Sequence, residues 1–131
     1  FTLGHDFKPA NIHAGGLRYH GAGMIISQLV KDGYMHGVDV AQTEAFEAGM
    51  LFARVEGIIP APESCHAIAA TIREAKKATE EGKNTVILFC LSGHGLIDMP
   101  SYESYLNGDL HDYRVSDEEI NKFLQTVPQV D

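Results

Sequence analysis

A short segment that could take part in ligand binding or catalysis, Ser92-Gly93-His94-Gly95, follows an unbroken run of apolar or β-branched residues, Thr85–Leu91. Such a run between turn signals predicts a strand that is buried on both faces. In open α/β sheets, ligands bind just past the carboxyl ends of the strands, where Ser92 would lie. Its hydroxyl can both donate and accept a hydrogen bond. A plain strand-to-helix turn would carry the same residues, so this segment alone leaves both interpretations open.

A second polar group, Glu63 and Ser64, stands at the expected start of a helix, after Pro60 and Pro62. Backbone N–H groups at a helix N-terminus are unpaired and favour a negative partner. Glu63 can therefore be a first-turn acid, and Ser64 a capping group, without any further role. Local reasoning does not separate these structural roles from functional ones.

The seven histidines and two cysteines show no spacing typical of a metal or thiol site. His-x-x-x-His and Cys-x-x-Cys motifs do not occur. Cys65 and His66 are neighbours on an expected helix, so their side chains point about 100° apart and cannot form a nucleophile–base pair. We expect the histidines to be solvated or hydrogen-bonded.

Length and composition indicate one ordinary globular domain at most, with 131 residues, 44% hydrophobic and 21% charged. The net charge of −8 argues against nucleic acid and against an anionic membrane surface as partners. No apolar run approaches the roughly 18 residues of a membrane span. Two isolated cysteines fit a reducing compartment. The chain begins with Phe1 and not Met, so we expect its natural N-terminus to lie upstream.

The periodicity predicts five helices and few strands, within an α/β fold. Val38–Ala41 is a candidate short strand besides Thr85–Leu91. The glycine-rich residues 1–23 predict an ordered loop with unusual backbone angles. The buried stripe of the third helix is expected to comprise Cys65, Ile68, Ile72 and Ala75. The expected helices are Met24–Lys31, a second from its N-cap Thr43 to Gly57, Glu63–Glu80 stopped by Gly82, Pro100–Leu106, and a last one opened by a capping box of Ser116 and Glu119.

Three separated motifs resemble one family, the tryptophan synthase β chain, a pyridoxal-phosphate enzyme of the second fold type. Glu56–Ala67 reads EGIIPAPESCHA, and Leu91–Gly95 reads LSGHG. His13–Gly21, HAGGLRYHG, is similar to the divergent second branch of the family. The resemblance covers about Gly4 to Leu110 and matches the C-terminal part of a β chain.

The resemblance implies a three-layer α/β/α fold with a partly parallel sheet, incomplete in this chain. Residues 1–131 would form the C-terminal segment of the catalytic domain. The family's lysine that holds the cofactor covalently, and its glycine-rich phosphate-binding loop, lie in the N-terminal half. We therefore expect the 131 residues alone to be inactive.

For the site, the resemblance implies that the Ser92 hydroxyl meets the pyridine nitrogen of the cofactor. A neutral hydroxyl leaves that nitrogen largely unprotonated, which favours β-elimination and replacement over transamination. Glu63 matches the acid–base glutamate near the cofactor ring. Ser64 and Gly93 are expected to line the cofactor pocket.

The third motif implies a monovalent cation, Na⁺ or K⁺, bound by the backbone carbonyls of Leu17, Tyr19 and Gly21. Exposed carbonyls of a glycine-rich loop suit such an ion. Arg18 stands where the common branch has an acid. Because arginine matches phosphate geometrically, we expect a more anionic substrate there, such as phosphoserine.

The expected function of the full-length parent is the condensation of indole with serine or phosphoserine to give tryptophan, in the cytoplasm. A β chain of the family is a homodimer and often pairs with an α chain that makes indole, a pairing left open for this branch. Two alternatives remain: a non-catalytic, self-associating fold fragment, and a paralogue with a different acceptor.

Overall fold

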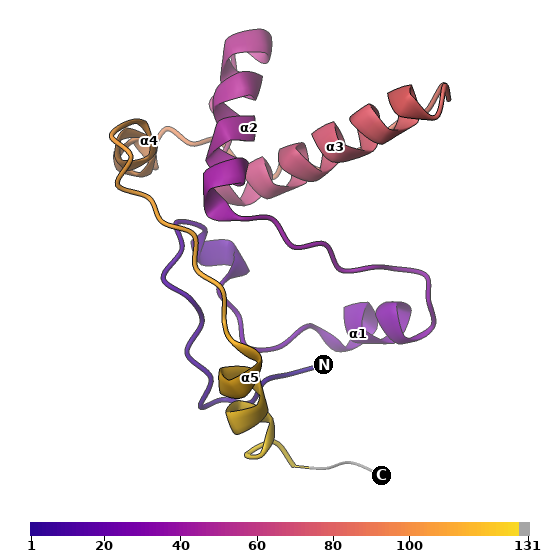
Figure 1. Cartoon of the computed structure of the whole chain (residues 1–131), viewed down its shortest axis with the longest axis vertical. Coiled ribbons are helices and arrows are strands. Elements are labelled where there is room, and N and C mark those ends of the chain that lie inside the picture. The colour runs from indigo at the N-terminus through magenta and orange to yellow at the C-terminus, as the bar shows by residue number, and fades with distance from the viewer. Residues whose placement is uncertain (129–131) are drawn as a thin grey trace. The chain divides into compact units, whose positions relative to one another are not determined.

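The computed structural model describes residues 1–128, which divide into two compact units (Figure 1). The first unit comprises residues 1–12, 16–38 and 113–128 of the described chain. The second comprises residues 13–15 and 39–112, and it holds both the EGIIPAPESCHA and the LSGHG segments.

The second unit is built on three helices: α2 Gln42–Glu56, α3 Pro62–Glu80 and α4 Met99–Leu106. Helices α2 and α3 cross at an angle, as Figure 1 shows. Gly57 ends α2 in the left-handed region with φ 71°, and Gly82 follows α3 with φ 64°. The three predicted helices of this unit are confirmed to within one or two residues at each end, and both glycine stops are also confirmed.

Two apolar clusters hold α2 against α3 and α4. The first contains Ala45, Phe46, Cys65, Tyr102 and Leu110, and the second Ala48, Ile68 and Ala69. The ring of Phe46 meets that of Tyr102 edge-on, with the centroids 5.0 Å apart. The predicted buried stripe of α3 is confirmed at Cys65 and Ile68, whereas Ala75 is exposed because α3 extends beyond α2.

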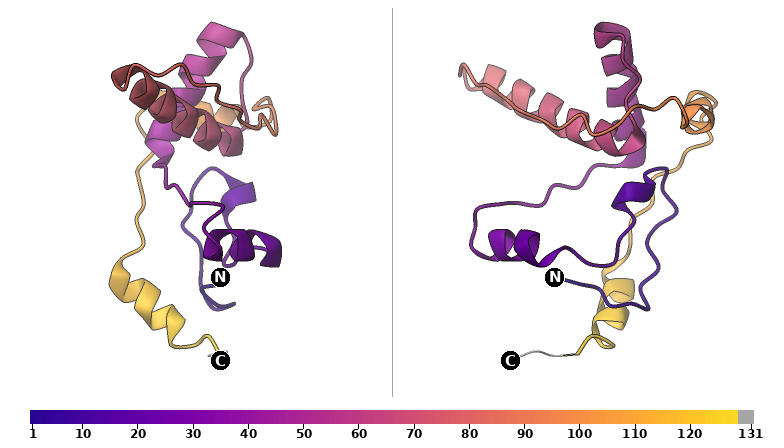
Figure 2. Two further views of the ribbon diagram at one scale, coloured as in Figure 1. Left: turned by 90° about the vertical axis from the view of Figure 1, so that its right-hand side faces the viewer. Right: turned by 180° about the vertical axis from the view of Figure 1, so that it is seen from behind.

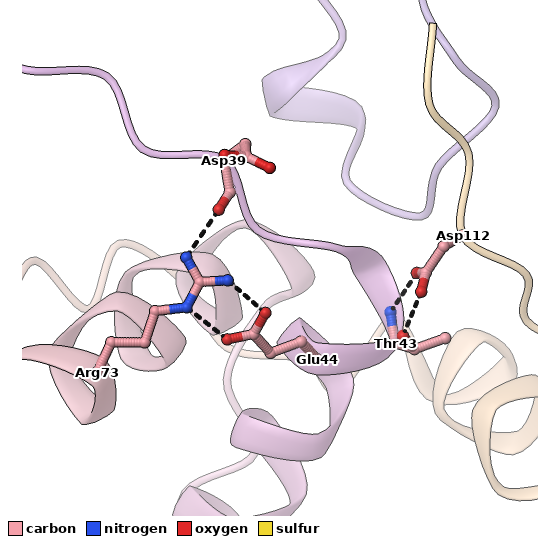
Figure 3. Close-up of polar contacts among 5 residues, drawn as sticks. All are labelled: Asp39, Thr43, Glu44, Arg73 and Asp112. Atoms are coloured by element: carbon pink, nitrogen blue, oxygen red, sulfur yellow. Dashed lines mark hydrogen bonds and ion pairs between the residues drawn. The ribbon is translucent and has the colours of Figure 1, made fainter. Parts of the chain in front are cut away.

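Polar contacts near the start of α2 correct one prediction (Figure 3). Ala41, not Thr43, is the N-cap of α2. Thr43 lies inside the helix, and its backbone N–H and hydroxyl donate to the Asp112 carboxylate at 3.0 and 2.7 Å. Beside it, Arg73 Nε donates to Glu44 Oε1 at 2.7 Å and so ties α3 to the first turn of α2.

The predicted strands are not observed. Among residues 1–128 the structure assigns isolated bridges but no strand, so Thr85–Leu91, Val38–Ala41 and the predicted sheet are not formed here. Residues 85–91 run back beside α3 without regular structure (Figure 2), and the Phe89 ring packs edge-on against Phe52 at 5.9 Å. The reason is physical: a strand needs a neighbour for its backbone hydrogen bonds, and none of the described residues supplies one.

The first unit contains α1 Met24–Lys31 and α5 Asp117–Leu124. The capping box of Ser116 and Glu119 is present as predicted. The ring of Phe7 packs edge-on against Phe123 at 5.2 Å. In no helix of the described chain is there a stretch long and apolar enough to cross a membrane.

The glycine-rich loop is ordered mainly by backbone contacts, not by unusual angles. It contains the short 3-10 helix η1, Gly15–Leu17, and a bridge between Thr2 and Gly21. Of the glycines in residues 1–23, Gly4 alone has a positive φ. The expected unusual backbone angle is therefore found at Gly4 and not at the other glycines of this loop.

Candidate functional site

The two motifs of the second unit meet in a short antiparallel crossing. Pro60 and His94 form an isolated bridge. On either side of it, the Ala61 N–H donates to the Gly93 carbonyl at 2.9 Å and the Gly95 N–H donates to the Ile59 carbonyl at 2.8 Å. Segments about thirty residues apart in the sequence are thereby fixed side by side, and α3 begins directly after this crossing.

The crossing brings together the three residues predicted to hold the cofactor. The hydroxyl oxygens of Ser64 and Ser92 lie 3.1 Å apart, and the Gly93 N–H donates to Ser64 Oγ at 3.2 Å. Ser64 is buried, with 1% of its surface exposed, whereas Ser92 is exposed. No side chain caps the start of α3, so the capping alternative for Ser64 is wrong.

The hydrogen-bond pattern allows Ser92 to keep its proton for a ligand. Ser64 Oγ accepts from Gly93, and its own proton has the Ser92 oxygen at 3.1 Å as its nearest acceptor, against 3.5 Å for the Gly93 carbonyl. When Ser64 donates to Ser92, the exposed Ser92 hydroxyl is free to donate to a ligand. A neutral donor of this kind suits an unprotonated aromatic nitrogen.

Glycines allow the close approach of the two motif segments. A Cβ on Gly93 would lie 3.2 Å from that of Ala61, tighter than ordinary contact. A Cβ on Gly95 would overlap the Pro60 carbonyl oxygen and lie 3.0 Å from the Tyr102 ring. The small residues of the LSGHG motif therefore serve packing as well as any ligand contact.

Glu63 lies in the first turn of α3, as predicted, and its charge acts on Asp98. Burial and then the Glu63 carboxylate raise the pKa of Asp98 above its ordinary value, and His94 acts in the opposite direction. Glu63 and His94 therefore both lie close enough to Asp98 to act on its charge.

The thiol of Cys65 is part of the core. Burial is the main reason that the pKa of Cys65 is raised, and Asp98 and Glu63 add to the rise. A raised pKa keeps the thiol protonated and poorly nucleophilic. Both cysteines are free, Cys65 buried and Cys90 exposed.

The residues predicted for the cation and for substrate charge lie in the other unit. Leu17 and Tyr19 are 49% and 72% exposed, and Arg18 and Gly21 are also exposed. Within residues 1–128, no hydrogen bond uses the backbone carbonyls of Leu17, Tyr19 or Gly21, whereas the His20 carbonyl accepts from Leu3 at 2.8 Å. No cluster of three or more side-chain metal ligands occurs in the described part of the chain.

Sequence reasoning missed Tyr102, whose hydroxyl donates to the Pro60 carbonyl beneath the crossing at 2.6 Å. Its signal was present, because Met99, Tyr102 and Leu106 recur at helical spacing in the short fourth helix. Sequence reasoning also missed an open groove of about 690 Å³ between α2, α3 and α4. The groove is lined by apolar and charged side chains and by none of the predicted site residues.

Comparison with known proteins supports the resemblance of the motifs. The chain is 63% identical over 102 residues to the tryptophan synthase beta chain 2 of Thermotoga maritima, a match that covers 78% of the chain and 24% of that protein. It is 57% identical to the protein of the same name from Aquifex aeolicus, over 86% of the chain and 26% of the relative. The corresponding protein of Pyrococcus furiosus is 54% identical over 97% of the chain and 28% of the relative. The chain thus spans about a quarter of the length of the curated relatives it matches. No protein-family model matches it.

Proposed function

Because the chain belongs to the tryptophan synthase beta chain family, we propose that it is the C-terminal segment of a pyridoxal-phosphate-dependent lyase. The whole protein would join indole to serine, or to an activated serine, to give tryptophan. The observation that carries this proposal is the serine pair: Ser64 and Ser92, from two motifs of the family, lie 3.1 Å apart at the crossing.

The residues present fit the cofactor. Ser92 would hold its ring nitrogen with a neutral hydroxyl, oriented by Ser64, while Gly93 keeps the backbone close to Ala61. When bound, pyridoxal phosphate supplies an electron sink. A neutral hydroxyl at its ring nitrogen makes this sink weaker, which favours β-replacement. Among the described residues, no carboxylate takes part in the hydrogen bonds of this serine pair, so the ring nitrogen would stay unprotonated.

Glu63 is proposed as the acid–base group. Its position next to Ser64 places its carboxylate at the same helix start, and Asp98 and His94 share its neighbourhood. In this role Glu63 would hand a proton to the departing serine oxygen and steady the indole nitrogen during attack.

Arg18 and the glycine-rich loop are proposed to serve substrate and cation. The unused carbonyls of Leu17, Tyr19 and Gly21 suit Na⁺ or K⁺. The exposed guanidinium of Arg18 suits a phosphorylated serine.

For the whole protein we propose the fold of the second type, with Thr85–Leu91 as one strand of its sheet. Val86 and Leu88 are 98% and 96% exposed, which supports the proposal that another part of the whole protein covers this apolar segment. We also propose a homodimer, and a reducing, cytoplasmic location in keeping with two free cysteines. Pairing with a tryptophan synthase α chain is an additional proposal.

The test is tryptophan formation from indole by the chain expressed with its natural upstream sequence and supplied with pyridoxal phosphate. Serine and phosphoserine are offered in parallel. We expect product, and we expect Ser92→Asp to suppress it, because a carboxylate would hold the ring nitrogen protonated. A cofactor-loaded protein that forms no tryptophan from either donor would contradict the proposed reaction.

The donor preference tests Arg18 separately. Arg18→Asp should shift the preference from phosphoserine towards serine, because the carboxylate repels a phosphate. Arg114→Asp, an exposed arginine of the same unit, makes the same charge change elsewhere. An unchanged preference in Arg18→Asp, or an equal shift in both variants, would remove Arg18 from substrate recognition.

A further inference from the structure

The hydroxyl of Tyr102 is bonded to the peptide group that joins the two motifs. Tyr102 is 3% exposed, and its hydroxyl donates to the Pro60 carbonyl at 2.6 Å. Pro60 is fully buried and has no N–H, so this carbonyl is its one backbone polar group. A buried carbonyl needs a donor, and within the described residues its only other hydrogen-bond donor is the weak thiol of Cys65, 4.0 Å away.

The same peptide group makes the contact to the LSGHG motif. The Pro60 carbonyl and the Ala61 N–H belong to one planar unit and point to opposite sides of it. The carbonyl is held by Tyr102, and the N–H donates to Gly93 at 2.9 Å. Gly93 in turn bonds Ser64, which meets Ser92. The orientation of this one peptide plane therefore influences the positions of Ser64 and Ser92 through this chain of hydrogen bonds.

Tyr102 has no room to move aside. Its oxygen is also 3.2 Å from Cys65 Sγ. A Cβ on Gly49 would lie 2.5 Å from that sulfur and 2.9 Å from the Tyr102 oxygen, and a Cβ on Gly95 would lie 3.0 Å from the ring. The phenol is thus enclosed by two positions where only glycine fits.

We propose that Tyr102 is a positioning residue for the cofactor site, which it orients through the peptide plane of Pro60 and Ala61. This inference rests on the proposed function, because the group that Ser92 would hold is the cofactor. Burial and the contact with Cys65 raise the pKa of Tyr102, so the hydroxyl stays a donor throughout the working pH range. Tyr102 itself touches no reacting atom.

The test is Tyr102→Phe in the whole protein, which removes the hydroxyl and keeps the ring against Phe46. Two readouts are needed: amide hydrogen exchange at Ala61, and the dissociation constant and absorption spectrum of bound pyridoxal phosphate. We expect exchange at Ala61 to become about three- to tenfold faster and cofactor binding to weaken by a similar factor, because one buried hydrogen bond is lost. The absorption band should shift as it does in Ser92→Ala.

Two matched variants separate positioning from stability. Tyr105→Phe removes a hydroxyl from the same helix, where the ring stacks on Phe46 at 5.8 Å and the hydroxyl has no hydrogen bond among the described residues. Phe46→Leu loosens the same cluster without touching the Pro60 carbonyl. Both should retain the wild-type cofactor spectrum and affinity.

The outcomes are distinguishable. Wild-type exchange at Ala61 together with wild-type cofactor binding in Tyr102→Phe would overturn the proposal. An equal loss of affinity in Phe46→Leu would also overturn it, because stability alone would then explain the effect. A wild-type protein that binds no pyridoxal phosphate would contradict the proposed function instead, and the exchange at Ala61 would then decide the Tyr102 contact by itself.

Discussion

The crossing of the two motifs and the glycine-rich loop carry the predicted site residues in two very different ways. The crossing rests on a closed core in which Phe46 and Cys65 are almost fully buried. In the loop, η1 contains no buried residue, and Tyr19 is 72% exposed. One region is positioned by packing from three helices, and the other by backbone bonds to the first residues of the chain.

The difference shows which part of the proposed site this chain specifies by itself. The serine pair is fixed by a peptide plane, two glycines and a buried tyrosine, all within residues 49–102. The carbonyls of Leu17, Tyr19 and Gly21 have no comparable support from side chains of the described residues. Two pairs of substitutions test this contrast, and a third pair tests the charge beside the crossing.

The largest expected effect comes from Phe46→Ala compared with Tyr19→Ala. Phe46 is 1% exposed and packs against Tyr102 and Tyr105, so its truncation should lower the free energy of unfolding by about 3–5 kcal/mol. Tyr19→Ala should change it by less than about 0.5 kcal/mol. Denaturant unfolding of the whole protein measures both. Equal losses would break the comparison, because they would show that the loop is also buried in the whole protein.

A smaller effect is expected from Gly95→Ala compared with Gly15→Ala. The new Cβ at position 95 would overlap the Pro60 carbonyl, so overpacking should cost about 1–3 kcal/mol of unfolding free energy and loosen the serine pair. At Gly15 nothing lies within 4 Å of the added Cβ, and the change should stay within about 0.5 kcal/mol. Unfolding and cofactor affinity are measured together. A Gly95→Ala protein as stable as the wild type would show that the crossing tolerates a wider separation.

Local signals predicted the helices well because their causes are local. The apolar spacing of α3, the glycine after α2 and the capping box of Ser116 each act within a few residues. Thr43 shows the limit: its side chain could cap a helix, but Asp112, far along the chain, engages it instead. A competing tertiary partner is not visible in a local pattern.

The sequence motifs indicate the parts of the candidate site but not how these parts meet. Ser64 and Ser92 stood out through their motifs, whereas their mutual contact depends on the crossing at Pro60 and on Tyr102. Nothing in the helical spacing of Tyr102 indicates which carbonyl its hydroxyl reaches. The strand predicted at Thr85–Leu91 does not form. Its apolar run is typical of a buried strand, but the neighbouring strands that would bond its backbone are not among the described residues.

The smallest expected effect concerns Asp98, beside the crossing. Burial and Glu63 raise its pKa above the ordinary value of 3.8, so the folded protein binds this proton more tightly than the unfolded chain. The resulting contribution to stability is complete below pH 3.8 and is lost as the pH rises through the folded pKa. Asp98→Asn removes this dependence. The wild type should therefore lose stability relative to Asp98→Asn as the pH rises through that window.

Unfolding of both proteins at several pH values measures the difference, which solvent screening keeps small at a partly exposed carboxylate. Asp109→Asn, an exposed acid of the same unit, reports what the loss of any one negative charge does. If the difference between wild type and Asp98→Asn moved in favour of the wild type as the pH rose, the carboxylate would be held ionised. His94, not Glu63, would then be its dominant partner.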